Sequence, residues 1–353
     1  MTGILTPYTI PPTPWYNLFM TTKIAINGFG RIGRAALKIA LEKTDLEVVA
    51  INDLSDTKTL AHLLSHDTIY GRYGRQVSFD QANLIVDGKV IPVTAEKDPK
   101  NLPWEKLGVD VVLECTGFFT TGEKAQAHIT AGAKHVIISA PADGEGVDTI
   151  LLGVNEDKLV DQKIISNGSC TTNCITPLAQ IIEENFGIEK AMMTTVHAMT
   201  SAQNLVDGPS KDLRRARAAS YNIVPTTTGA AKATAQAMPG LTGKFDGLSM
   251  RVPVPTVSIA DYCILIKRDT TKEEINEVLK KASESERYTG IVAVTDEPAV
   301  SSDFIGDPHS SIVDLALTNV VAGNLIKVVA WYDNEWGYTN RLVEQAIAIG
   351  SRN

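Results

Sequence analysis

The sequence predicts an α/β protein with a doubly wound parallel sheet in its first half and a second, α+β domain whose sheet is mostly antiparallel. Up to about residue 170, short apolar runs alternate with helical stretches, which is typical of parallel sheets. Beyond that point the apolar runs are longer and more alternating, with fewer helices between them, as in antiparallel sheets. At 353 residues the chain also exceeds the usual size of a single domain.

The first half begins with a strand, a tight turn and a helix. Residues 23–27 form an apolar run that ends at Gly28, and residues 34–43 have helical periodicity. Buried strands are then expected at residues 47–53, 109–117, 135–141 and 163–166.

The second half begins with a helical stretch at residues 177–186. Longer strands follow, and the chain ends in an amphipathic helix. The strand segments cover residues 191–199, 247–268 and 325–333.

These patterns give the domain limits. We expect the first domain at residues 21–169 and the second at 170–337, with the C-terminal helix, 338–353, packing back on the first. Residues 1–20 carry four prolines and no charged side chain, so they are expected to be a flexible N-terminal extension. Whether this extension is a tail, an upstream start or an arm that docks its aromatic side chains stays open.

Composition excludes several classes of protein. The formal charge of -8 and pI near 5.4 give no global attraction to nucleic acid or anionic lipid. No apolar run approaches the roughly 20 residues of a membrane-spanning helix. Four cysteines are too few for a disulfide framework and suit a reducing compartment, so a cytoplasmic location is expected.

The turn after the first strand carries a nucleotide-binding pattern. Residues 28–33, GFGRIG, form G-x-G-x-x-G between a strand and a helix, and Asp53 ends the next strand. Gly28 permits the turn, Gly30 lets the backbone approach a pyrophosphate, and Gly33 allows close helix packing. Asp53 would accept from ribose hydroxyls and repel a 2′-phosphate, which favours NAD over NADP. The pattern indicates a Rossmann-type dinucleotide-binding domain; a glycine-rich turn without a ligand is the alternative.

A cysteine lies where a strand passes into a helix. Cys170 falls at or near the helix N-terminus, where free N–H groups and the helix dipole would lower its thiol pKa and prepare it to attack a carbonyl. A zinc site with Cys174 is improbable because no second Cys or His cluster accompanies the pair, and no metal is expected. Cys174 is interpreted as a small buried hydrophobic residue.

A thiol nucleophile needs a general base. His197, at the end of a β-branched run, is the best placed of the six histidines. On pattern alone, a core or surface role for His197 is as good an interpretation as a catalytic one.

At this point eight segments carry a close resemblance to a known family. INGFGRIGR, INDL, SNGSCTTNC, TTVHAMT, DLRRARAA, PTTTGAAKA, MRVPVP and WYDNEWGYTNR occur in the order and approximate spacing of the glyceraldehyde-3-phosphate dehydrogenase family. The resemblance runs from about Lys23 to the C-terminus and leaves out only the first 20 residues. It identifies the second half as an α+β catalytic domain.

The resemblance implies roles on the substrate side. Cys170 would be the nucleophile and His197 its base. Thr200 and Arg251 would hold the substrate phosphate; Arg251 is also a cation in an apolar run, where a lone charge is costly. The remaining phosphate-binding residues would be Ser169, Thr171, Arg215, Thr228 and Gly229. A solvated basic loop is the alternative for Arg215. Simple helix capping is the alternative for the loop that enters a helix at residues 226–231.

The resemblance also implies cofactor contacts and an assembly. Gly28, Gly30, Gly33 and Asp53 would be joined by Arg31, Ile32, Lys97, Ser139 and Asn334, with Asn334 on the nicotinamide carboxamide. A long loop over residues 198–223 would approach a neighbouring subunit, so a homotetramer is expected. Met199, Ala202 and Gly168 depart from the family pattern, and the first two are expected to alter the phosphate affinity.

Together these features predict a phosphorylating, NAD-dependent dehydrogenase of glyceraldehyde 3-phosphate that works through a cysteine hemithioacetal and thioester. Its product would be 1,3-bisphosphoglycerate, and its partners would be the substrate and inorganic phosphate. One alternative is an erythrose-4-phosphate dehydrogenase. Another is a non-catalytic RNA-binding or adapter protein on the same scaffold.

Overall fold

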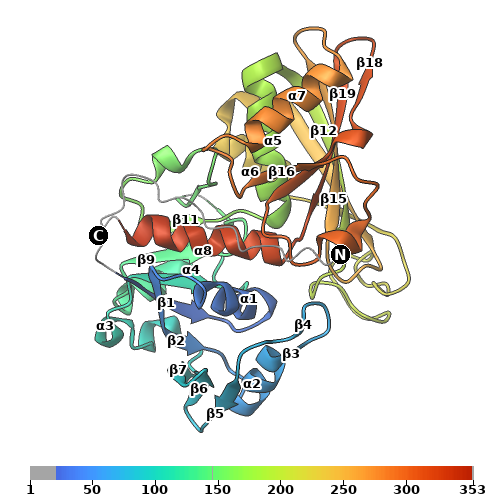
Figure 1. Cartoon of the computed structure of the whole chain (residues 1–353). Coiled ribbons are helices and arrows are strands. Elements are labelled where there is room, and N and C mark those ends of the chain that lie inside the picture. The colour runs from blue at the N-terminus through green and yellow to red at the C-terminus, as the bar shows by residue number, and fades with distance from the viewer. Residues whose placement is uncertain (1–20, 145, 352–353) are drawn as a thin grey trace, which may run out of the picture.

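A computed structural model describes residues 21–144 and 146–351 of the chain. The predicted extension at residues 1–20 lies outside the described residues. The described residues form two large sheets, one above the other in Figure 1, with the C-terminal helix between them. None of the described helices is long and apolar enough to cross a bilayer.

The first sheet confirms the predicted doubly wound core. From β10 to β7 every neighbouring pair is parallel, whereas β7, β6 and β5 pair antiparallel at one edge, which the sequence patterns had not predicted. In spatial order the strands are β10 (Asp148–Thr149), β11 (Ile164–Ser166), β9 (His135–Ile138), β8 (Val111–Glu114), β1 (Thr22–Asn27), β2 (Leu46–Asn52), β7 (Lys89–Thr94), β6 (Asn83–Val86) and β5 (Val77–Phe79).

Helices flank this sheet, and side chains cap two of them. Asp56 and Thr121 accept hydrogen bonds from the first turns of α2 and α4. A short hairpin, β3 (His66–Asp67) and β4 (Gly71–Arg72), follows α2. The helices here are α1 (Arg31–Ala40), α2 (Thr57–Ser65), α3 (Trp104–Leu107) and α4 (Gly122–Thr130).

The second sheet is mostly antiparallel, as predicted, and among the described strands only β12·β14 and β16·β17 pair in parallel within it. In order its strands are β13 (Val224–Thr227), β14 (Phe245–Val252), β12 (Ile188–Ala198), β15 (Ser258–Ile266), β19 (Leu325–Tyr332), β17 (Ser311–Asp314) and β16 (Val292–Thr295), with β18 (Asn319–Val321) on β19. The single stretch expected at 247–268 is two strands, because Pro253 and Pro255 lack the N–H that a ladder needs.

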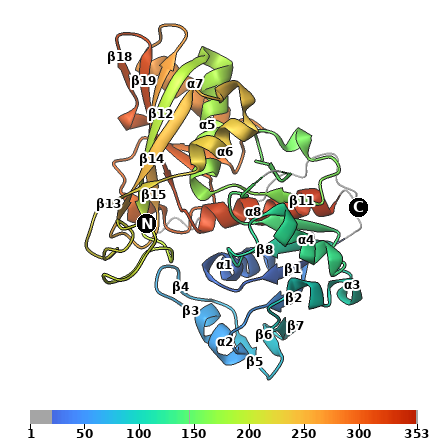
Figure 2. The ribbon, with the colours of Figure 1, turned by 180° about the vertical axis from the view of Figure 1, so that it is seen from behind.

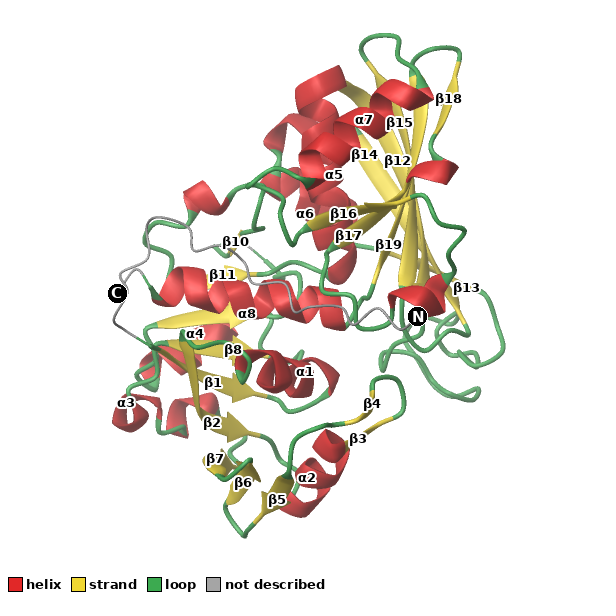
Figure 3. Ribbon diagram, viewed as in Figure 1, coloured by secondary structure: helices red, strands yellow, loops and turns green. Residues whose placement is uncertain are grey.

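One face of the second sheet carries the core. Buried and half-buried residues alternate along β15, as a strand with one covered face requires. The helices α5 (Cys170–Phe186), α6 (Ala230–Ala237) and α7 (Lys272–Ser283) lie together on one side of it in Figure 3.

Short 3-10 turns occur in both halves of the chain, at η1 (Pro99–Asn101), η2 (Glu156–Lys158), η3 (Pro239–Leu241), η4 (Ser301–Phe304) and η5 (Leu315–Leu317).

The C-terminal helix α8 (Trp336–Gly350) begins two residues before the predicted limit. Its residues Leu342 and Val343 share a buried cluster with Ile24 of β1 and Leu37 of α1. Seen from behind in Figure 2, α8 lies along the first sheet and below the helices of the second. The chain therefore returns to the first sheet after completing the second.

Candidate active site

The glycine turn between β1 and α1 uses its three glycines for different purposes. Gly28 has a φ of +92°, and a Cβ there would lie 2.7 Å from the Thr116 backbone nitrogen. A Cβ on Gly33 would overlap the Gly28 carbonyl oxygen. A Cβ on Gly30 would meet nothing within 4 Å. Gly28 and Gly33 are thus required by the fold itself, whereas Gly30 leaves open space at the turn.

The first turn of α1 offers backbone donors to that space. Gly30 is the N-cap of the helix and no side chain caps it. The N–H groups of Arg31 and Ile32 belong to the first helical turn, which has no intrahelical acceptors. Uncapped N–H groups together with the helix dipole form a site for a phosphate. The turn therefore fits the pyrophosphate of a dinucleotide.

The Arg31 side chain is engaged elsewhere. Its guanidinium donates to Asp67, at 2.6 Å, and to Glu335, which precedes α8. Burial opposes its charge, but the hydrogen bonds and charges of Glu335 and Asp67 raise the pKa of Arg31 overall. Because its side chain is paired in this way and links α1 to the start of α8, Arg31 can donate a hydrogen bond to an anion through its backbone N–H.

Asp53 follows β2 and is fixed beside the glycine turn. Its Oδ2 accepts from the Phe29 backbone N–H at 2.7 Å, and its Oδ1 accepts from the Ser55 backbone N–H at 2.9 Å. A carboxylate held here suits ribose hydroxyl donors and disfavours a phosphate. The residues of this edge therefore fit NAD.

Two further predicted cofactor residues follow strands of the same sheet. Ser139 comes directly after β9, and its N–H donates to the Glu114 carbonyl at 3.0 Å. Lys97 lies in the exposed loop after β7. Both lie beyond carboxyl ends of parallel strands, the edge at which such sheets bind ligands.

Cys170 is the first residue of α5, as predicted. Its N-cap Ser169 accepts from the Thr172 N–H at 3.0 Å, so the turn that carries the thiol is held in place. The Cys170 Sγ lies 3.3 Å from Nε2 of His197. The structure therefore brings the predicted nucleophile and base into contact, although they are distant in the sequence and lie on a helix and a strand.

His197 lies near the end of β12, opposite Arg251 of β14 in the parallel register. Its Nδ1 is 2.7 Å from the Ala198 carbonyl oxygen and 2.5 Å from Nη1 of Arg251. The two neighbours of Nδ1 make opposite demands, because the Ala198 carbonyl can only accept and the Arg251 guanidinium can only donate. When Nδ1 carries the proton, both Nδ1 and Arg251 Nη1, at 3.1 Å, donate to the Ala198 carbonyl, and Nε2 is left as an acceptor facing the thiol. This is the tautomer that a base for Cys170 requires.

The charges at this pair differ from the sequence prediction. Burial raises the pKa of the Cys170 thiol, although the Arg251 charge and hydrogen bonds from Thr171 oppose the rise. The prediction of a lowered pKa was wrong, because the loss of solvent outweighs the helix terminus. Burial, and then Arg251, lower the pKa of His197 to about 3. The pair is therefore a neutral thiol beside a neutral imidazole.

Arg251 is a half-buried cation with no carboxylate partner among the described residues. Burial lowers its pKa, and the charge of Arg215 lowers it further. Of the three arginines at 214–217, Arg215 is half-buried and near enough to act on Arg251, whereas Arg217 is exposed and pairs with Asp207. Guanidinium groups gathered near a thiol favour an anionic ligand.

The other predicted phosphate residues lie at helix starts and in the loop after β12. Thr228 and the N-cap Gly229 precede α6, and Thr228 Oγ1, one residue before the N-cap, accepts from the Ala230 N–H at 3.2 Å. Helices α5 and α6 touch within two turns of their starts, where the Thr176 and Thr234 hydroxyls are 2.9 Å apart. Thr200, half-buried, directs its N–H to Gln203 at 3.3 Å.

Tyr332 is a site residue that the sequence patterns did not identify. Its hydroxyl lies 2.9 Å from Thr171 Oγ1 and 2.7 Å from Thr195 Oγ1, and its ring meets His197 edge to face. It thus joins the start of α5 to β12, behind the thiol and the imidazole. The pattern of buried positions along β19 could have predicted that the Tyr332 side chain is buried, but not that it contacts these three residues.

The remaining cysteines offer no second centre. Cys174 is fully buried, burial raises its pKa to about 12, and it packs in the core as predicted. All four cysteines are free thiols. Among residues 21–144 and 146–351, no group of three His, Cys, Asp or Glu side chains could hold a metal ion.

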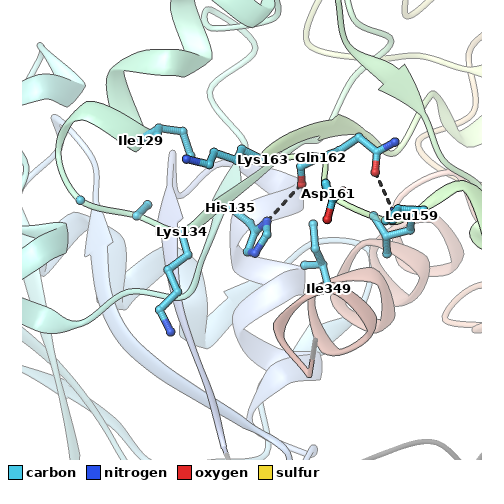
Figure 4. Close-up of a pocket in the computed structure, with 11 residues that line it drawn as sticks. Ile129, Lys134, His135, Leu159, Asp161, Gln162, Lys163 and Ile349 are labelled. Atoms are coloured by element: carbon cyan, nitrogen blue, oxygen red, sulfur yellow. Dashed lines mark hydrogen bonds between the residues drawn. The ribbon is translucent and has the colours of Figure 1, made fainter. Parts of the chain in front are cut away.

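A surface pocket of about 540 Å³ lies away from this site (Figure 4). Its lining includes Lys134 and His135 at the beginning of β9, Lys163 just before β11, and Ile349 near the end of α8. These lysines precede their strands, whereas Gly28 and Cys170 follow theirs. The pocket therefore opens at the opposite edge of the first sheet.

Comparison with known proteins agrees with both halves of the site. Residues 22–122 match the family model described as the glyceraldehyde 3-phosphate dehydrogenase NAD binding domain, which confirms NAD as the cofactor, and residues 169–334 match the C-terminal domain of the same family. The chain is 53% identical over 336 residues to glyceraldehyde-3-phosphate dehydrogenase 2 of Streptomyces avermitilis, covering 94% of this chain and 100% of that protein.

Other relatives show the same likeness. The identity is 53% over 336 residues to glyceraldehyde-3-phosphate dehydrogenase of Geobacillus stearothermophilus, and 50% over 335 residues to glyceraldehyde-3-phosphate dehydrogenase 1 of Bacillus subtilis. Each comparison covers 94% of this chain and 99% of the relative. The chain belongs to the glyceraldehyde-3-phosphate dehydrogenase family.

Proposed function

We propose that this chain oxidises glyceraldehyde 3-phosphate with NAD and inorganic phosphate to 1,3-bisphosphoglycerate. The observation that carries the proposal is the 3.3 Å contact between Cys170 Sγ and His197 Nε2, with the Arg251 cation beside them. The names of the relatives support the substrate. When bound at the glycine turn and Asn334, NAD supplies the acceptor for the hydride that leaves the substrate carbon.

In the first step Cys170 attacks the aldehyde carbon. His197 Nε2 takes the thiol proton as the sulfur–carbon bond forms and then gives this proton to the former carbonyl oxygen, which yields a hemithioacetal and a neutral His197. A neutral imidazole suits this role because its Nε2 can accept, and the low pKa of His197, about 3, keeps it neutral across the physiological range. His197 then accepts the hydroxyl proton as the carbon loses its hydride, which leaves a thioester on Cys170.

Inorganic phosphate completes the reaction. A phosphate oxygen attacks the thioester carbon, the carbon–sulfur bond breaks, and an acyl phosphate and the Cys170 thiolate result. We assign Thr200 and Arg251 to the substrate phosphate, and the helix starts at Ser169–Thr171 and Thr228–Gly229 to the attacking phosphate. Arg215 assists through its charge beside Arg251, which is consistent with its effect on the Arg251 pKa.

The proposal includes a cytoplasmic homotetramer, in which the long loop at 198–223 approaches a neighbouring subunit. This loop has neither helix nor strand from Met199 to Ile223 and exposes Leu205, Val206 and Leu213. Exposed apolar side chains gathered in one loop are typical of an interface.

The test is NADH formation from glyceraldehyde 3-phosphate, with and without inorganic phosphate, in the wild type and in Cys170→Ser. Turnover that requires phosphate and falls by about 10³-fold or more in the variant supports the proposal. Erythrose 4-phosphate as a better substrate would favour the sugar-phosphate alternative. RNA binding with no turnover of either aldehyde would favour the adapter.

A further inference from the structure

Ser258, at the start of β15, joins two parts of the candidate site. Its hydroxyl accepts a hydrogen bond from the Ala198 N–H at 3.0 Å, and it donates to Oδ1 of Asn334 at 3.0 Å. Ala198 follows His197 on β12, and Asn334 lies just after the end of β19. Ser258 is 1% exposed and Asn334 is 7% exposed, so both bonds are sheltered from water.

The direction of this chain of bonds is fixed by chemistry. A backbone N–H can only donate, so the Ser258 oxygen must be the acceptor from Ala198. The single hydroxyl proton has no partner other than Asn334 among the described residues, so it is donated to Asn334, and the atom that receives it must be an acceptor. The side-chain oxygen of Asn334, and not its amino group, must therefore face Ser258.

The other end of the Asn334 amide is left available. Its Nδ2 makes no hydrogen bond with any residue in 21–144 or 146–351, although Asn334 is largely buried. Because the oxygen is directed to Ser258, the end of the amide that remains for a ligand is the amino group, which is a donor. The neighbouring backbone is rigid, because Asp333 accepts from the N–H groups of Gly306, Glu335 and Trp336.

We infer that Ser258 is a positioning residue that presents Asn334 to the nicotinamide as a hydrogen-bond donor only. The site would then recognise the carbonyl oxygen of the nicotinamide carboxamide and be indifferent to its amino group. Because Ser258 is also bonded to the backbone beside His197, it holds this donor in register with the base. The inference rests on the proposed function in placing Asn334 against the nicotinamide.

Equilibrium binding can test this without turnover. Dissociation constants are measured for NAD, for its 3-acetylpyridine analogue, which keeps the carbonyl but lacks the amino group, and for its thionicotinamide analogue, which replaces the carbonyl oxygen with sulfur. In the wild type we expect the thio analogue to lose more affinity relative to NAD than the acetyl analogue. The opposite order in the wild type would overturn the inference, whatever the variants do.

Ser258→Ala removes the donor that orients Asn334. We expect NAD to bind about threefold to tenfold more weakly, which is the effect of one hydrogen bond. We also expect the discrimination against the thio analogue to decrease, because the Asn334 side-chain amide can then rotate and exchange its oxygen and amino group. ADP-ribose, which lacks the nicotinamide, should bind Ser258→Ala as it binds the wild type. An equal loss for all four ligands would mean a merely structural role and would contradict the inference, as would an unchanged selectivity.

Two controls complete the experiment. Ser249→Ala changes a serine of the same sheet that is equally buried but has no hydrogen-bond partner among the described residues, so it should keep wild-type selectivity. Ser258→Thr keeps the hydroxyl and should restore the selectivity. Failure of the wild type to bind NAD would contradict the proposed function itself. If the wild type binds NAD and Ser258→Ala has the same selectivity as the wild type, only this inference is contradicted.

Discussion

The glycine turn and the Cys170–His197 pair differ in the atoms that they offer to a ligand. At the turn, the groups on offer are backbone N–H groups of α1, and the side chain of Arg31 is directed to Asp67 and Glu335. At the pair, the groups on offer are side chains 3.3 Å apart on a helix and a strand. A backbone site depends on local conformation, whereas a side-chain site depends on how distant segments are packed together.

This difference predicts where each kind of substitution acts. A change in a side chain at the second site should remove chemistry and leave cofactor binding intact. An added methyl group at the first site should alter binding or folding and leave the reacting pair intact.

The largest effect is expected at the base. His197→Asn should lower kcat by about 10²- to 10⁴-fold, because His197 is the group in contact with the thiol that can take its proton. The Kd for NAD should stay within about twofold of the wild type, since the turn is built from backbone. Steady-state kinetics and equilibrium binding measure the two quantities, with the exposed His62→Asn as a matched control. A parallel loss of NAD affinity in His197→Asn would break the distinction between the two sites.

The next effect separates two glycines of one turn. Gly30→Ala should leave the free energy of unfolding unchanged, because its Cβ meets nothing within 4 Å, yet weaken NAD binding by about tenfold, or about 1.4 kcal/mol. Gly33→Ala should destabilise the protein by about 1–3 kcal/mol or more, because its Cβ would overlap the Gly28 oxygen. Denaturant unfolding and NAD titration of both variants measure this. Equal effects of the two substitutions on stability would contradict the assignment.

A smaller effect concerns the Cys170 charge. The Arg251 cation favours the thiolate, so Arg251→Gln should raise the Cys170 pKa above its wild-type value. The pH profile of iodoacetamide labelling should then move to higher pH. Below the pKa, the labelling rate at a fixed pH should fall by up to about tenfold for each pH unit by which the profile moves. Arg251→Lys keeps the charge and should stay near the wild-type profile. A profile that moves to lower pH in Arg251→Gln would contradict this electrostatic assignment.

The contrast also explains what could be predicted from the sequence. The turn at residues 28–33 was predicted together with its strand and helix, because glycine spacing reports local backbone conformation. The position of Cys170 at the start of α5 was predicted for the same reason: it is a local transition from strand to helix.

Tertiary packing accounts for what was missed. No pattern near Arg31 reveals Glu335, which lies close to the other end of the chain. The role of Tyr332 depends on the register that places β19 beside β15, and the contact of His197 with Arg251 depends on the register of β12 and β14. The Cys170 pKa was predicted with the wrong direction because burial depends on segments from the whole chain.

The most direct test of the central claim is to trap the acyl group on its sulfur. The chain is mixed with NAD and glyceraldehyde 3-phosphate without inorganic phosphate, quenched in acid and digested for peptide mass spectrometry. We predict a phosphoglyceryl adduct that fragmentation of the peptide assigns to Cys170 and not to Cys174, and that disappears when phosphate is added before the quench. Turnover without an adduct on Cys170, or an adduct on Cys115, Cys174 or Cys263 instead, would contradict the account.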